Sequence, residues 1–69
     1  MKFYVKTSYY DDVSDFETFD SADEAGECYQ GTIDQRRDLG MAFGDVSRIS
    51  TGTQSSDGKL HVKAAVSFE

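Results

Sequence analysis

Hydrophobic and polar residues alternate over the first ten positions of the chain. Phe3, Val5, Thr7 and Tyr9 would share one face of an extended segment, because successive side chains of a strand point to opposite faces. The segment is also rich in β-branched and aromatic residues, which strands favour. The pattern predicts a strand over residues 2–10.

Three later segments also have strand character. Residues 16–19 predict a short second strand, joined to the first by a polar turn that contains Asp11 and Asp12. Residues 46–51 predict a third strand, and the Asp-Gly pair at 57–58 predicts a turn after it. The last segment alternates most clearly, with five residues expected on one face: Leu60, Val62, Ala64, Val66 and Phe68.

A helix is predicted between the second and third strands. Ser21 followed by Glu24 fits a capping box at its start, and Gly40 is a typical terminator. Four residues recur at helical spacing and would form one apolar face, with Cys28 beside them: Ala22, Ala25, Tyr29 and Ile33. Two glycines at 26 and 31 cost roughly 1 kcal/mol each relative to alanine, so a break near residue 31 is a possible alternative.

These elements predict a single α+β domain over residues 1–69. The expected fold is a mostly antiparallel sheet of three to four strands with one helix packed on one face, in the order ββαββ, or βαββ if 16–19 stays irregular. The proposed core comprises Phe3, Val5, Ala25, Tyr29, Ile33, Ile49, Leu60, Val62, Val66 and Phe68.

The balance of charge limits the partners that the chain is expected to bind. Thirteen acidic residues against seven basic ones give a net charge of −6, which disfavours direct binding to nucleic acid or to an anionic membrane surface. A basic protein surface is the easier partner. No apolar run of membrane-spanning length and no leader pattern is present, and a single cysteine cannot form an internal disulfide, so a cytoplasmic protein is expected.

Few residues offer catalytic or metal chemistry. A dyad of Cys28 and His61 would need both groups within hydrogen-bond reach, but Cys28 is expected beside the apolar helix face and His61 on the far face of the last strand. The acidic cluster from Asp11 to Glu17 lacks the glycine and glutamate of a calcium loop, and no phosphate-binding glycine motif occurs. We therefore expect no catalytic residue, metal or cofactor.

The most informative feature is a block without cations. Between Lys6 and Arg36 the chain has no Lys or Arg but nine acidic residues, which we take as a candidate partner-binding surface: Asp11, Asp12, Asp15, Glu17, Asp20, Asp23, Glu24, Glu27 and Asp34. On the helix, a stripe from Asp20 to Asp38 opposite the apolar face would be about 27 Å long. The alternative is that these acids satisfy the helix dipole and keep the protein soluble.

Two smaller groups of residues are further candidates for contact. Tyr9 and Tyr10, with Tyr4, lie beside the acidic turn and are typical of an aromatic anchor with a charged rim. Met41 and Phe43 would form an exposed apolar tip unless their segment packs against the core.

The segment Thr18-Phe19-Asp20-Ser21-Ala22-Asp23-Glu24-Ala25 joins a strand to a capped helix, with short hairpins before and after it. This layout resembles that of many small bacteriophage proteins, including anti-CRISPR proteins and phage inhibitors of host enzymes. The resemblance implies a monomeric or dimeric inhibitor that occupies a basic surface of a host nucleoprotein, in the host cytoplasm. It assigns no individual site residue.

Three functional hypotheses follow from the sequence. The first is a non-enzymatic, protein-binding inhibitor, in its most specific form an anti-CRISPR, whose acidic face mimics nucleic acid and blocks a basic nucleic-acid-binding surface. The second is a structural or assembly module that pairs through a free sheet edge, for example the final strand. The third is a small hydrolase or metal-dependent enzyme.

Overall fold

The computed structural model describes residues 1–40 and 45–68. It contains strands β1 (Lys2–Tyr9) and β2 (Ser14–Phe19), helix α1 (Ala22–Leu39), and strands β3 (Val46–Gln54) and β4 (Leu60–Ser67). This order confirms the ββαββ arrangement. The expected apolar tip at Met41 and Phe43 lies outside the described residues.

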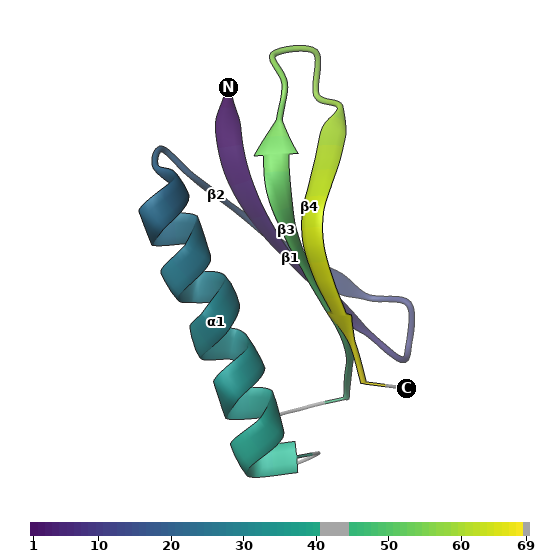
Figure 1. Cartoon of the computed structure of the whole chain (residues 1–69). Helices are drawn as coiled ribbons and strands as arrows, with labels where there is room; N and C mark the ends of the chain where they lie inside the picture. Colours follow the sequence, from purple (N-terminus) through teal and green to yellow (C-terminus); the bar gives the residue numbers. More distant parts are fainter. Residues whose placement is uncertain (41–44, 69) are drawn as a thin grey trace.

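The four strands form one open antiparallel sheet in the order β2-β1-β3-β4. Helix α1 lies on one side of this sheet and packs against β3, β1 and β2 (Figure 1). Strand β4 is the edge strand next to β3, on the side of β3 away from β1. The predicted α+β class is therefore confirmed. We call the side that α1 covers the helix face, and the other side the open face.

The strand register assigns the side chains of the first hairpin to the two faces. Val5 lies opposite Glu17 and Thr7 lies opposite Asp15, so all four residues point to the helix face. Phe16 and Phe19 point to opposite faces, as their spacing in the sequence predicts. Every residue of β2 except Phe19 is exposed, which is consistent with its place at the sheet edge.

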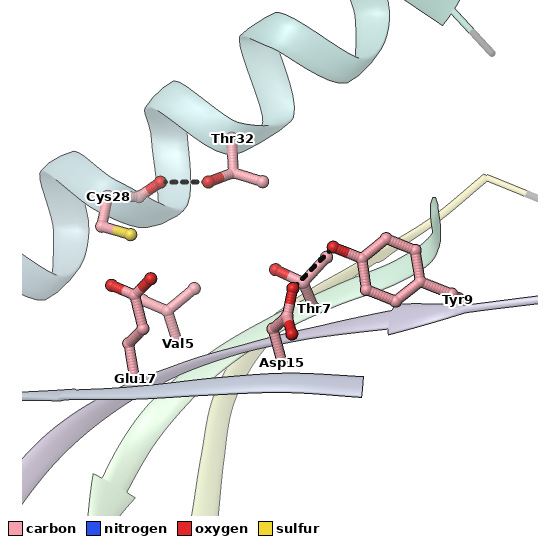
Figure 2. Close-up of a pocket in the computed structure, with 7 residues that line it drawn as sticks. All are labelled: Val5, Thr7, Tyr9, Asp15, Glu17, Cys28 and Thr32. Carbon is pink, nitrogen blue, oxygen red and sulfur yellow. Dashed lines mark hydrogen bonds between the residues drawn. The ribbon is translucent and has the colours of Figure 1, made fainter. Parts of the chain in front are cut away.

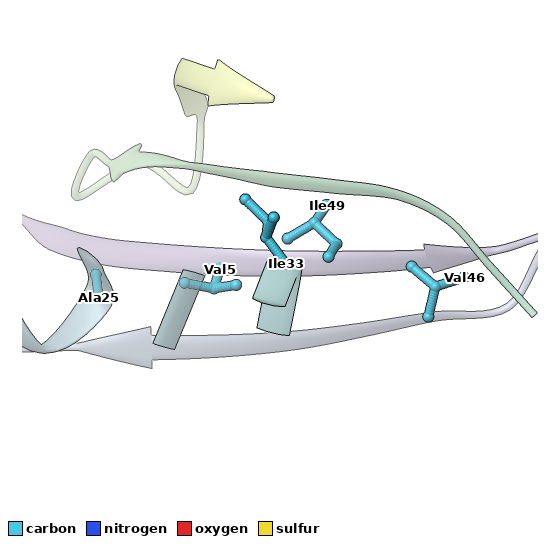
Figure 3. Packing of buried hydrophobic residues seen from close by; sticks show 5 residues of the cluster. All are labelled: Val5, Ala25, Ile33, Val46 and Ile49. Atoms are coloured by element: carbon cyan, nitrogen blue, oxygen red, sulfur yellow. The ribbon is translucent and has the colours of Figure 1, made fainter. Parts of the chain in front are cut away.

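The core lies between α1 and the helix face of the sheet. Its five buried residues come from the helix and from β1 and β3, as Figure 3 shows: Val5, Ala25, Ile33, Val46 and Ile49. Four of the predicted core residues are confirmed here, and four more pack against this cluster while partly buried: Phe3, Tyr29, Val66 and Phe68. Val46, which is completely buried, is an addition to the predicted core.

The prediction that Leu60 and Val62 belong to the core is wrong. They are 40% and 57% exposed, because the pairing of β3 with β4 slips between Thr51 and Gly52. Thr51 lies opposite Ala64 and Gly52 lies opposite Val62, so β4 contains one extra residue at this β-bulge. The bulge moves Leu60 and Val62 to the open face, while Ala64 and Val66 stay on the helix face.

Helix α1 begins and ends at the predicted residues, but the Glu24 carboxylate accepts the Ser21 hydroxyl, where a capping box has it accept the backbone N–H. The Ser21 hydroxyl accepts the backbone N–H of Glu24 at 3.2 Å and donates to the Glu24 carboxylate at 3.3 Å. At the other end, Gly40 has a φ of 58°, a conformation that residues with a side chain rarely adopt. The helix is continuous through Gly31, so the alternative of a break there is wrong.

Candidate protein-binding surface

Five carboxylates lie on the side of α1 that faces away from the sheet. Since residues of an α-helix follow one another at 100°, a row on the outer side is expected opposite Ala25 and Ile33, which are buried. The members of this row, which we call the outer stripe, are all exposed: Asp23, Glu24, Glu27, Asp34 and Asp38. The predicted acidic helix face is therefore present as an exposed surface.

Asp20 does not extend the outer stripe as expected. It lies in the bend before the helix, where it forms an ion pair with Lys2 at the start of β1. This hydrogen-bonded ammonium lowers the pKa of the Asp20 carboxyl. The outer stripe accordingly begins at Asp23 and is about 22 Å long, rather than the 27 Å expected from the sequence.

The last helical turn carries two arginines, and Arg36 is directed toward the sheet. Its Nε donates a hydrogen bond to the Val46 carbonyl oxygen at 3.2 Å, and its guanidinium carbon lies 4.9 Å from the centre of the Phe68 ring. Arg37 is exposed beside the outer stripe. Arg36 therefore ties the end of α1 to β3 and to the end of the chain, on the side away from the outer stripe.

The structure separates the acids of the first turn from those at the helix start. Asp11 and Asp12 lie between β1 and β2, whereas α1 starts after the other end of β2. The Asp11 carboxylate accepts the Val13 backbone N–H at 3.3 Å, and Asp12 has a φ of 67°. Both residues thus shape a tight turn, at the opposite end of the hairpin from Asp23 and Glu24.

Asp15 and Glu17 lie on the helix face of β2 and line a small pocket beneath the flank of α1. Figure 2 shows this pocket, which has a volume of about 170 Å³ and is lined by Val5, Thr7, Tyr9, Asp15, Glu17, Cys28 and Thr32. The two carboxylates are exposed at the sheet edge. They add negative charge beside the helix.

The pocket shifts the pKa of two of its groups. The Tyr9 hydroxyl donates to Asp15 at 2.8 Å, and this hydrogen bond is the main reason that the pKa of Tyr9 is raised. Burial raises the pKa of the Cys28 thiol, and the nearby Glu17 carboxylate adds to the effect. A thiol whose pKa is raised is a weaker nucleophile at neutral pH, since the thiolate is the reactive form.

The two tyrosines predicted as contact residues also have roles within the chain. Tyr9 is partly buried and packs against the core. Tyr10 is 49% exposed, and its hydroxyl donates to the Phe68 carbonyl oxygen at 3.2 Å. The third tyrosine of this group, Tyr4, is buried, so it is not available as an exposed anchor.

Sequence reasoning missed the chemistry of the open face. Lys6 and Arg48 line a hollow of about 170 Å³ there, together with Tyr4, Ser8, Ser50, Leu60 and Val62. None of the four strands places an acidic side chain on this face over the residues that the structure describes. The protein is therefore negative on the helix and β2 side and positive on the open face, a separation that net charge alone conceals.

The groups required for the catalytic alternatives are not brought together. Cys28 faces the β2 side of the helix, whereas His61 is on β4, at the other edge of the sheet. Within residues 1–40 and 45–68, no cluster of three or more His, Cys, Asp or Glu side chains has the geometry to hold a metal ion. The described part of the chain also has no helix with the length and hydropathy needed to cross a membrane.

Comparisons of the chain with protein-family models, with curated proteins and with solved structures found no match.

Proposed function

We propose that the protein is a non-enzymatic binding protein whose outer stripe docks on a basic, nucleic-acid-binding surface of a partner and thereby inhibits it. The observation that carries this proposal is the outer stripe itself, an exposed row of five carboxylates on a helix whose Arg36 is directed toward the sheet. Because the row lies on one regular helix, its charges are held in fixed relative positions, which favours electrostatic recognition.

The outer stripe has a lower density of negative charge than a nucleic-acid strand, but of the same order. Five carboxylates over about 22 Å have a mean axial spacing of roughly 5.6 Å, against about 3.4 Å between phosphates along one strand of DNA. The carboxylates form two groups, one from Asp23 to Glu27 and one of Asp34 and Asp38. Gln30 lies between the groups and donates its amide N–H to Asp34 at 3.0 Å.

Asp15 and Glu17 widen this surface toward the edge of the sheet. They flank α1 on the side of Cys28, so a partner that approaches the helix from the β2 side meets acids from two elements. Negative charge from both elements would steer a basic partner from a distance, and salt would weaken this attraction. The helix and β2 together are the surface that we assign to the partner.

The most specific form of this proposal is an anti-CRISPR protein or a related phage inhibitor, active in the host cytoplasm. It is supported by the small acidic α+β fold, by the resemblance of the strand-to-helix junction to such proteins, and by the exposed carboxylates. A CRISPR effector holds its nucleic acids in positively charged channels, which are suitable targets for an acidic helix.

The proposal is tested with two charge reversals, Glu27→Lys and Asp38→Lys. Neither side chain forms a hydrogen bond or ion pair among the described residues, and a lysine at 38 suits the dipole at the end of the helix. The wild-type protein first captures its partner from a bacterial lysate at low salt, and the partner is identified by mass and purified. We expect the double variant to bind that purified partner at least roughly tenfold more weakly.

A matched pair of variants separates the surface from the net charge. Glu27→Gln on the outer stripe and Ser56→Lys in the β3–β4 turn each raise the net charge by one, and only the first should weaken binding. A duplex of DNA or RNA should also compete with the protein for the partner. Equal effects of the paired variants, or unchanged affinity of the double reversal at low salt, would remove the proposal.

A further inference from the structure

The two edges of the sheet are open in the structure, and they differ in charge. Strand β2 forms one edge and β4 forms the other, and neither has a second neighbour within the described residues. Such an edge presents unpaired backbone N–H and C=O groups that another strand can bind. β2 contains Asp15 and Glu17 and no base, whereas β4 contains His61 and Lys63 and no acid, with Lys59 next to it.

This distribution selects one kind of pairing between copies. If β2 paired with β2 of a second copy, the acids of the two strands would face each other. If β4 paired with β4, the basic residues of the two strands would face each other. Like charges that face each other on neighbouring strands are destabilising. Only β2 against β4 brings opposite charges together. The lysines at β4 therefore disfavour the pairing of β4 with β4 but not the pairing of β4 with β2.

Exposed apolar side chains at the two edges are complementary in the same way. Phe16 of β2 is 43% exposed, and Leu60 and Val62 of β4 are the exposed apolar residues at the opposite edge. All three point to the open face. A contact between β2 and β4 of another copy would bury them against one another, and apolar cross-strand pairs of this type stabilise a sheet.

The direction of the strands permits this contact without turning one copy over. All neighbours in the order β2-β1-β3-β4 are antiparallel, so β2 and β4 run in opposite directions. Placing a second copy in the same orientation beside the first continues the alternation, with all helices on one side. In each copy the two free edges are the two ends of the strand order.

We propose that copies of this chain assemble head to tail, with β2 of one copy paired antiparallel to β4 of the next. The register that matches both faces puts Phe16 opposite Val62, Glu17 opposite His61 and Asp15 opposite Lys63. Phe16 and Val62 meet on the open face, and Glu17 and His61 on the helix face. This inference rests on the sheet edges and does not depend on the proposed function. Since both use Asp15 and Glu17, self-assembly and the docking of a partner over β2 are alternatives, whereas the outer stripe stays accessible in both.

Such a contact is heterologous, because it joins two different surfaces, and it leaves a free edge at each end of the assembly. Growth beyond the dimer is therefore expected, as an open filament or as a ring closed by the twist of the sheet. β2 has six residues, so the paired segment is only about 20 Å long. Association should accordingly be weak and reversible, and it should require high protein concentration.

The experiment uses the full chain, in sedimentation velocity at low salt over a range of concentrations. The wild type should form species larger than a dimer, and added salt should shift them toward the monomer. Glu17→Lys leaves β2 with one acid and one base, so that it loses its net negative charge, and Lys63→Glu gives a chain in which β2 stays acidic and β4 loses its positive charge. Each variant alone should associate roughly fivefold more weakly than the wild type, with circular dichroism used to verify that it is folded.

Mixing the two variants supplies the decisive measurement. The β2 edge of Lys63→Glu and the β4 edge of Glu17→Lys are both unaltered, so an equimolar mixture should recover one wild-type contact, in a heterodimer that contains both chains. A wild type that is monomeric at all concentrations, or that stops at a closed dimer, would overturn the proposal. So would two folded variants whose mixture associates no better than either alone.

Discussion

Tyr4 and Phe16 stack on the open face of the sheet, with ring centres 5.5 Å apart and ring planes inclined by 21°. They come from neighbouring strands, since Phe16 lies opposite Lys6, two residues along β1 from Tyr4. Tyr4 is 1% exposed although α1 covers only the other face. The protein thus buries a large aromatic side chain under neighbouring side chains of the sheet, where a two-layer fold would leave it in water.

This burial predicts a large difference between two aromatic truncations. Tyr4→Ala should lower the free energy of unfolding by about 3 kcal/mol or more, because it removes a fully buried ring. Phe16→Ala should cost about 1 kcal/mol, since the ring is partly exposed. Urea denaturation of both variants and of the double variant should give a coupling energy of about 0.5–1.5 kcal/mol. A double variant that combines Tyr4→Ala with the distant, exposed Val13→Ala should give no coupling energy.

Two glycine substitutions should change stability in opposite directions. Gly52 is at the bulge, and a Cβ there would overlap the His61 carbonyl of β4, so Gly52→Ala should cost about 2 kcal/mol or more. Gly31 is on α1, where a Cβ would meet nothing, so Gly31→Ala should raise the free energy of unfolding by about 1 kcal/mol. Thermal melting measures both. If Gly52→Ala left the free energy of unfolding unchanged, the close approach of β4 at the bulge would not require a glycine at position 52.

The sequence predicts local features of this fold better than it predicts the burial of β4. The capping residue Ser21, the apolar positions 25 and 33 and the order of elements follow from short-range patterns, and the structure confirms them. The bulge opposite Gly52 does not follow from such a pattern, because it depends on how two strands pair. Regular alternation from Leu60 onward therefore predicted a single apolar face that the structure divides between two.

The candidate surface was predictable to a similar extent. The helical period is enough to place Glu27 and Asp34 on the outer side of α1, where they lie. It gives no information on contacts between distant segments, such as the ion pair of Asp20 with Lys2. The basic open face was missed because its cations, Lys6 and Arg48, are 42 residues apart and meet only through the register of β1 with β3.

The helix cap gives a third prediction. Ser21→Ala removes the oxygen that accepts the Glu24 N–H, and it should lower the free energy of unfolding by about 1 kcal/mol. Ser21→Asp keeps an acceptor and should restore most of this loss. Asp23→Asn, which alters only the interaction of a charge with the helix dipole, should cost less than about 0.5 kcal/mol. Equal losses for Ser21→Ala and Asp23→Asn would show that the hydrogen bond from the Glu24 N–H to Ser21 stabilises the helix no more than one charge at its dipole does.

Cys28 gives a prediction on reactivity, because the pKa of its thiol is raised by burial and by the Glu17 carboxylate. A raised pKa means that less thiolate is present at a given pH, so Cys28 in the folded chain should react more slowly with a thiol reagent than in the urea-unfolded chain. The rate in the folded chain should also rise with pH over a higher range. Glu17→Gln removes a neighbouring negative charge, lowers the pKa of the thiol and should increase the rate at pH 8.

Glu27→Gln is the matched control for this measurement, since it makes the same change in net charge on the outer side of α1, away from the pocket of Cys28. It should leave the rate nearly unchanged. The reaction is followed at low protein concentration, so that pairing through β2 does not protect the thiol. If both variants increased the rate equally, the overall charge of the protein, rather than Glu17, would set the pKa of Cys28.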